Sequence, residues 1–170
     1  MLLHLLALVP AAIGVCCLAL DRRPARAGEL VAGVAMLAAM IDAAVTGLVA
    51  AVWWAALLVA GALALSAVRG RRRSAAAAMP GAAAMTMHAA TGMIAMAALM
   101  IGMPAAGALE VAGHSHGHGA PAIGTAGALL GASYVVASAV LAARTRVALD
   151  RAQYGAMAAS VGLMSLALVA

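Results

Sequence analysis

Charged residues are scarce in this sequence of 170 residues: Asp, Glu, Lys and Arg together make up 9% of it, whereas 67% is hydrophobic. Soluble domains contain about a quarter charged residues and about half apolar ones. A mean hydropathy of +1.10 therefore places the chain in a lipid bilayer. Because a crossing helix needs about 20 apolar residues, roughly five to seven spans would leave little chain for a soluble catalytic domain.

Phenylalanine and lysine are among the residue types that the sequence lacks altogether. All ten basic residues are Arg, and Ala and Gly dominate, a bias typical of a GC-rich bacterial genome. Without Phe another bulky side chain must fill gaps between helices, and Met, present 12 times, is the adaptable filler. Such a genome does not favour Met codons, however, so the methionines also invite interpretation as soft metal ligands.

Catalytic motifs are also missing. The sequence contains no nucleotide-binding loop, nucleophile triad, C-x-x-C-H or H-E-x-x-H, so we predict that the protein is not an enzyme. The two cysteines, Cys16 and Cys17, are adjacent and would point about 100° apart on a helix, where they bridge each other poorly. We interpret them as small buried apolar groups, with binding of Cu(I) by their thiolates as the alternative.

Short polar breaks divide the apolar sequence into six predicted spans. The breaks are "DRRPARAGE" (21–29), "RGRRRS" (69–74), "LEVAGHSHGHGAP" (109–121) and "RTRVALDR" (144–151). The apolar stretch 30–68 is too long for one crossing, so we expect a tight turn near Gly47. We therefore predict an all-α transmembrane bundle forming a single domain. Its spans lie at about 2–20, 30–47, 50–68, 82–104, 122–143 and 153–170, with a His-rich loop at 105–121.

All ten arginines fall in three of these breaks, which six spans would bring to one side of the membrane. The positive-inside rule makes that side cytoplasmic, so both termini and the 105–121 loop are predicted to lie outside a bacterial cell membrane. Trp53, Trp54 and Tyr154 then fall near the interfaces, where aromatic residues gather. The arginines explain the net charge of +5 through membrane lipid headgroups, so no nucleic acid partner is expected.

The stretch "MTMHAATGMIAMAALMIGM" (85–103) places six methionines and one histidine on the fourth predicted span. At 100° per residue, five of the methionines and the histidine share an arc of about 140°, whereas Met87 points away. Thioethers and imidazole suit Cu(I), and hard cations do not choose them. The shared arc is formed by His88, Met85, Met93, Met96, Met100 and Met103.

A second pair, Met36 and Met40, occupies one face of the second predicted span. Its spacing resembles the methionine pair that lines the pore of trimeric eukaryotic copper importers. If the two helices face each other, their sulfurs offer the three or four soft ligands that Cu(I) takes. The alternative is that all of these methionines only fill space in the core.

The loop sequence "HSHGHG" places His114, His116 and His118 at alternating positions, which an extended backbone would aim in one direction. Neutral imidazoles bind Cu or Zn, and Glu110 can add an oxygen ligand. The alternative is an ordinary solvated loop. His4, at the outer end of the first span, either joins these histidines or is a plain interfacial residue.

Asp42 is the one acidic residue inside a predicted span. A carboxylate in hydrocarbon is costly and needs a partner, for which His4, His88 or a bound cation are the candidates. The alternative is an interfacial acid in a shallow hairpin. In "GALLG", Gly127 and Gly131 have the spacing of close helix contacts.

The Ala-rich six-span pattern, with "MPGAAAMTMHAATGMIAMAALM" and a His-bearing loop, resembles small integral membrane proteins of actinobacteria. The resemblance implies a bacterial source and supplies no activity. We predict a protein that binds or transports a soft metal ion, with copper as the expected metal. The loop histidines would capture it and pass it to Met103, Met100 and Met96, with Met40, Met36, Asp42 and His88 deeper.

Two other functions stay open at this stage. One is a structural or accessory subunit that packs, through faces of small residues, into a homo-oligomer or a larger membrane complex. The other is a membrane enzyme that uses Asp42 and His88 as an acid–base pair.

Overall fold

Six long α-helices make up the computed structural model, which describes residues 2–21, 26–73, 80–103 and 120–169. Each is long and apolar enough to cross a membrane, so the predicted all-α class and the six span-length helices are confirmed. A π-helical turn, η2 (Asp42–Thr46), extends the second of them. The helices are α1 (Leu2–Leu20), α2 (Ala27–Ile41), α3 (Ala51–Arg73), α4 (Pro80–Gly102), α5 (Ala120–Arg144) and α6 (Ala148–Val169).

Several helices extend beyond their apolar part. Whereas hydropathy placed the start of the second span near 30 and the end of the third near 68, α2 begins at Ala27 and α3 ends at Arg73. Likewise α6 begins at Ala148 instead of near 153. Hydropathy marks the segment that fits hydrocarbon, while intrahelical hydrogen bonds continue into polar flanks. Between α2 and α3 the chain turns at Gly47, whose φ of 57° suits glycine.

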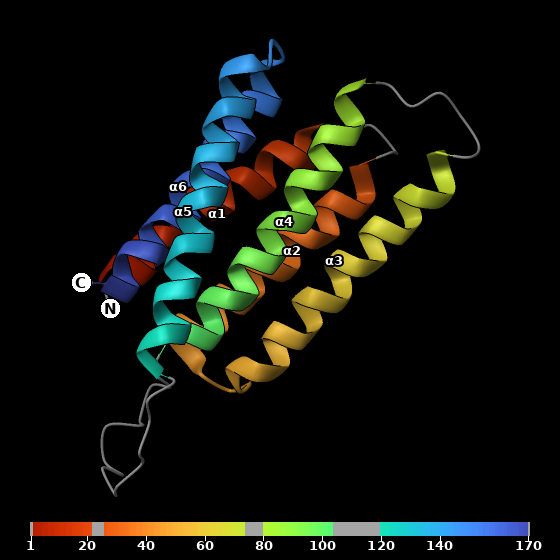
Figure 1. The fold of residues 1–170 in the computed structure, drawn as a ribbon. Helices are drawn as coiled ribbons and strands as arrows, with labels where there is room; N and C mark the ends of the chain where they lie inside the picture. Colours follow the sequence, from red (N-terminus) through yellow and green to blue (C-terminus); the bar gives the residue numbers. More distant parts are fainter. Residues whose placement is uncertain (1, 22–25, 74–79, 104–119, 170) are drawn as a thin grey trace, which may run out of the picture.

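The helices alternate in direction, so the bundle has two distinct ends (Figure 1). Both chain termini lie at the end where α2 turns into α3, which we call the terminal end. At the other end α1, α3 and α5 finish and α2, α4 and α6 begin. We call it the arginine end because the described arginines all lie there.

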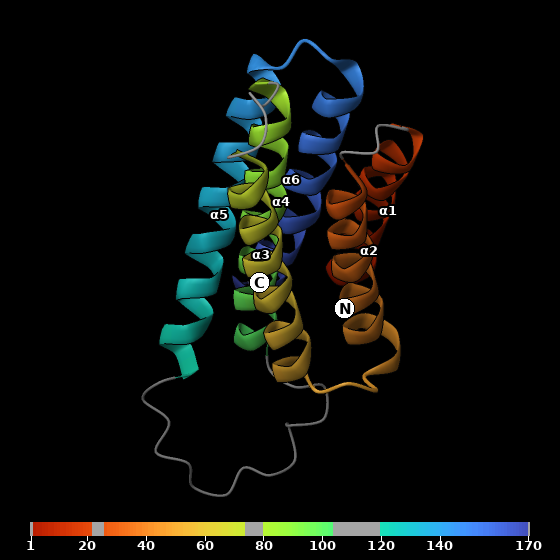
Figure 2. The same ribbon diagram turned by 90° about the vertical axis from the view of Figure 1, so that its right-hand side faces the viewer.

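Helix α4 is the most buried of the six and has neighbours on several sides. It packs against α3 and α5, and it also contacts α2 and α6, while α1 packs mainly against α6 (Figures 1 and 2). Close approach depends on small residues. A Cβ added to Gly127 would lie 3.1 Å from the carbonyl oxygen of Ala98, and one added to Gly131 would collide with Ser165. Both glycines therefore make the close helix contacts predicted from their spacing.

The aromatic residues divide between surface and core. Trp53, at the start of α3, is 70% exposed, whereas Trp54 is half-buried. Tyr154, predicted near the membrane interface, is only 2% exposed and points into the bundle. The reason is the rotation of α6, whose inward face repeats at helical spacing. That face consists of Asp150, Gln153, Tyr154, Met157, Ser160, Val161 and Met164.

Candidate metal-binding site

The methionines of α4 point into the bundle at the positions that the helical periodicity predicts. Met85, Met93, Met96 and Met100 are buried, and Met103 is half-buried against the core. Met87, expected to point away, is 50% exposed. These five inward methionines form what we call the methionine stripe, with Met36 and Met40 buried on α2.

The methionines of α4 and α6 nevertheless pack against different neighbouring helices. Met93 fills the space above Gly61 of α3, since a Cβ added to that glycine would lie 2.5 Å from the Met93 methyl carbon. Met157 of α6 occupies a similar notch, with its sulfur 3.1 Å from the position of a Cβ on Gly14. These two methionines are shaped to fill glycine notches, which is a packing role.

The sulfurs nearer the terminal end lie in a common core between α2, α4 and α6. Ser160 of α6 donates to the sulfur of Met40 on α2 at 3.6 Å, so this thioether accepts a weak hydrogen bond across the interface. Met40 belongs to the same buried apolar cluster as Met96, Met100 and Met164. Thioethers from three helices therefore share one buried apolar core.

His4 and Met103 form the one direct contact between imidazole and thioether that the described residues make. The Nε2 atom of His4, in the first turn of α1, lies 2.9 Å from the sulfur of Met103, just beyond the end of α4. Both side chains are half-buried at the terminal end. A nitrogen and a sulfur donor, far apart in sequence, are thus brought together. We call these two residues the His4–Met103 pair.

His88 belongs to a different environment, which we call the His88 cluster: His88, Tyr134, Ser138 and Tyr154. Its ring stacks on that of Tyr134 with centroids 4.8 Å apart, and it meets the ring of Tyr154 edge-on at 4.6 Å. Its Nε2 lies 2.8 Å from the Tyr134 hydroxyl, and its Nδ1 lies 3.4 Å from the Ser138 hydroxyl. Both ring nitrogens of His88 therefore have protein partners.

The hydrogen bonds of the His88 cluster assign a tautomer. Ser138 donates its hydroxyl hydrogen to the carbonyl oxygen of Tyr134 at 2.7 Å, which leaves its oxygen free to accept from Nδ1–H of His88. Nε2 then accepts from the Tyr134 hydroxyl. A neutral His88 satisfies every one of these bonds, and its nitrogens do not face the methionine stripe.

Tyr134 and Ser138 were missed in the sequence, although a signal for them exists. The chain has only two tyrosines, and both contact His88. Counted from the arginine end of their helices, His88, Tyr134 and Tyr154 lie within about three turns, so they occupy comparable depths. A polar group in hydrocarbon needs a partner at its own depth, and tyrosine is able to supply it.

The two histidines considered as partners of Asp42 are wrong, because neither His4 nor His88 lies against it. Its carboxylate instead accepts hydrogen bonds from the backbone amides of Leu48 and Val49 at 3.0 and 3.1 Å. The hydroxyl of Thr46 and, at 2.8 Å, the indole nitrogen of Trp54 also donate to it. Asp42 thus closes the turn between α2 and α3, which is a structural role.

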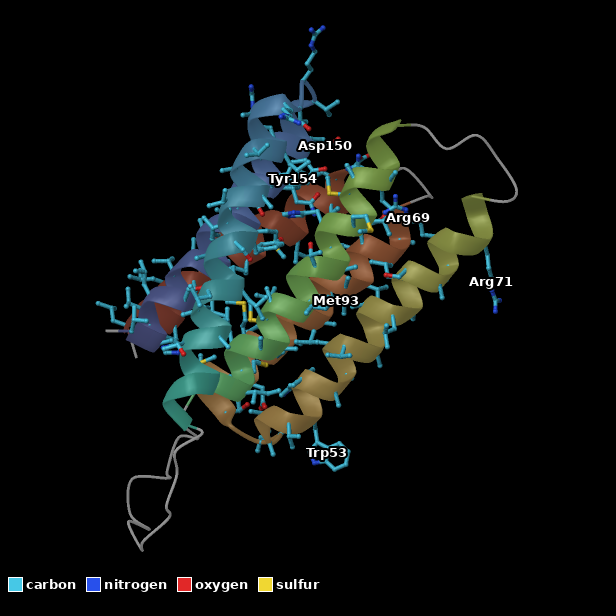
Figure 3. All side chains as sticks on the ribbon, in the orientation of Figure 1. Trp53, Arg69, Arg71, Met93, Asp150 and Tyr154 are labelled. Carbon is cyan, nitrogen blue, oxygen red and sulfur yellow. The ribbon has the colours of Figure 1, made fainter. Side chains whose placement is uncertain are left out.

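A buried ion pair at the arginine end was also missed. Arg26, only 7% exposed, places one guanidinium nitrogen 2.8 Å from Asp21 and 2.8 Å from Asp150. The hydrogen bond to Asp150 raises the pKa of the Arg26 guanidinium above its already high usual value. Figure 3 shows Asp150 and Tyr154 close together on α6, so this ion pair lies near the His88 cluster. Net charge alone does not tell a buried arginine from a solvated one.

Several candidate ligands lie elsewhere. His114, His116, His118 and Glu110 fall outside the described residues. Within residues 2–21, 26–73, 80–103 and 120–169, no group of three His, Cys, Asp or Glu side chains is placed to hold a metal ion. Cys16 is exposed and Cys17 half-buried, and neither forms a disulfide.

No protein-family model, curated protein or solved structure matches this chain. A functional assignment therefore depends on the geometry of the chain's own residues.

Proposed function

We propose that this protein is a multi-pass membrane protein that binds Cu(I), as a step in holding or transporting it. The observation that carries the proposal is the 2.9 Å contact between the His4 imidazole and the Met103 thioether. Neutral nitrogen and sulfur donors suit Cu(I), whereas Mg²⁺ and Ca²⁺ take oxygen ligands. Both side chains are half-buried, so they are more accessible than the fully buried sulfurs of Met96 and Met100.

The buried sulfurs behind this pair support passage deeper into the bundle. Met100 and Met96 follow Met103 along the inward face of α4, and Met40 faces the same core from α2. These thioethers supply the third and fourth ligands in the proposal. His114, His116 and His118 would deliver the metal from the loop, and that step should weaken below about pH 6.5, where free imidazole becomes protonated.

We further propose that the arginine end faces the cytoplasm of a bacterial cell, which directs the His4–Met103 pair outward. The concentration of arginines at one end supports this orientation. The test uses a variant in which Cys16 and Cys17 are replaced by Ser. In this background a cysteine introduced at Ser115 should react with an impermeant thiol reagent on intact cells, and one introduced at Ser74 should not. Labelling at Ser74 alone would reverse the orientation.

The ligand assignment is tested by titrating the purified, reduced protein with Cu(I) against a competing chelator. His4→Ala and Met103→Leu should each weaken binding by at least about tenfold, which corresponds to about 1.4 kcal/mol. Met87→Leu is the matched control, because this methionine of α4 is exposed and off the stripe. Wild-type affinity in the His4→Ala/Met103→Leu double variant would exclude the pair as ligands.

A structural or accessory subunit is the second candidate. The fit of Met93 against Gly61 and of Met157 against Gly14 favours this function. Packing against glycine explains the presence of these methionines without any bound metal. In that case the wild-type protein would not compete with the chelator at all, and the methionines would tolerate leucine.

A further inference from the structure

An apolar groove lies between α2 and α3, with α4 beneath it. Its volume is about 660 Å³, and all twelve residues that line it are Ala, Gly, Val, Leu or Met. Figure 2 shows α3 beside α4, with α2 set apart from α3. The volume is that of a site for a whole organic molecule. A lining without polar groups suits a hydrocarbon chain.

The length and position of the groove match one leaflet of a bilayer. On α3 it extends from Leu57 to Val68, which is about 16 Å at 1.5 Å per residue. Half of a hydrocarbon core of about 30 Å is close to this length. On α2 the groove reaches Ala27 and Gly28, the first residues of the helix, so it opens towards the arginine end.

Two charged side chains at this end of the groove have unsatisfied polar atoms. Nε and Nη1 of Arg69 and Oε2 of Glu29 are buried and have no hydrogen-bond partner, and in the described part of the chain no other side chain shares this property. Arg69 directly follows Val68, and Glu29 directly follows Gly28. In Figure 3 Arg69 extends from α3 towards α2 and α4, whereas Arg71 points away from the bundle.

Buried polar atoms without a hydrogen-bond partner are costly, so the Arg69 nitrogens need an acceptor and the Glu29 oxygen needs a donor. A guanidinium presents N–H groups that match the oxygens of a phosphate. The free oxygen of Glu29 needs a hydrogen-bond donor, while its other oxygen already accepts from Thr86 at 2.5 Å. A headgroup that carries both a phosphate and an ammonium contains one partner of each kind.

We propose that the groove binds one acyl chain of a phosphoethanolamine lipid from the leaflet at the arginine end. The phosphate accepts from Arg69, the primary ammonium donates to Glu29, and the chain covers the alanines and glycines of α2 and α3. An anionic lipid without the ammonium would place its charge near the Glu29 carboxylate. A choline lipid has the phosphate but no N–H to donate.

The test is native mass spectrometry of the full-length protein in detergent, titrated with phosphatidylethanolamine and phosphatidylcholine of identical acyl chains. We expect one phosphatidylethanolamine per protein, bound about tenfold more tightly than phosphatidylcholine, the effect of one charge-assisted hydrogen bond. Glu29→Gln should abolish this preference. Arg69→Gln should weaken both lipids, whereas Arg71→Gln should change neither.

Two matched variants on α3 test whether the lipid occupies the groove itself. Ala64→Phe places a ring in the groove and should weaken both lipids, whereas Ala67→Phe, on the same helix but outside the lining, should not. Equal binding of the two lipids by the wild type would overturn the proposal and leave Arg69 and Glu29 to pair through water. Displacement of the lipid by millimolar inorganic phosphate would also overturn it, because the headgroup alone would then explain binding.

Photo-cross-linking to the unmodified protein tests the binding site without relying on variants, which could fail to fold. A phosphatidylethanolamine carrying a photoreactive group in its acyl chain should cross-link to residues 27–35 or 57–68. Cross-links confined to other helices would contradict the groove as the binding site.

Discussion

The surroundings of His88 and of His4 differ in what they leave the imidazole free to do. His88 is buried between α4, α5 and α6, with both ring nitrogens engaged by Tyr134 and Ser138. His4 is half-buried at the terminal end, and its Nε2 atom contacts the sulfur of Met103. A histidine in the middle of a methionine-rich motif is thus committed to hydrogen bonds, while one outside the motif meets the soft ligand. Partners, more than proximity in sequence, decide which histidine is available to a metal.

The same contrast extends to the two halves of the bundle. Towards the arginine end, polar contacts connect separate helices: Arg26 with Asp150, and Glu29 with Thr86. Towards the terminal end Trp54 of α3 donates to Asp42, and thioethers make the contacts of His4 with Met103 and of Ser160 with Met40. We expect the first half to contribute polar interactions to stability and the second half to contribute soft ligands.

The largest effect expected on stability comes from removing Arg26. Arg26→Gln leaves Asp150 buried without its counter-charge, which should lower the free energy of unfolding by about 3–5 kcal/mol. Reversible unfolding in mixed micelles measures this loss, and Cu(I) affinity should not change. Arg151→Gln is the control, because Arg151 is exposed at the same end. A loss no greater than that of the control would mean that the buried ion pair between Arg26 and Asp150 does not stabilise the bundle.

A smaller effect is expected from Tyr134→Phe, which removes the hydroxyl beside Nε2 of His88. A buried acceptor left unsatisfied should cost about 1–3 kcal/mol in unfolding free energy. Tyr154→Phe is the matched control, because Tyr154 meets His88 through its ring edge. If Tyr134→Phe weakened Cu(I) binding as strongly as His4→Ala, the separation between the two histidine environments would be wrong.

The smallest effect on stability should come from Met96→Leu and Met100→Leu, which keep apolar volume and should each cost less than about 1.5 kcal/mol. Their effect on Cu(I) affinity should be clear, because leucine has no lone pair. The measurement is the chelator competition, with Met87→Leu again as the control. Unchanged affinity in the double variant would show that the buried sulfurs only pack, and would favour the accessory-subunit function.

Local patterns in the sequence were sufficient for the helices and for the inward face of α4. Apolar length predicts the six helices, and the 100° rotation per residue separates exposed Met87 from buried Met96 and Met100. These features depend on one helix at a time, since hydropathy and helical periodicity are properties of neighbouring residues. Which side chains meet across helices is a different kind of information.

Contacts between helices were decided only when the six helices packed. His4 reached Met103 across 99 residues, Tyr134 and Tyr154 enclosed His88, and Asp42 turned to its own hairpin instead of to a histidine. Each outcome depends on the order, rotation and relative depth of whole helices. Those quantities are set by the fit of many small side chains at once, such as Gly127 against the backbone of α4. No short motif carries that information, because in a chain so rich in Ala and Gly many pairings are locally equivalent.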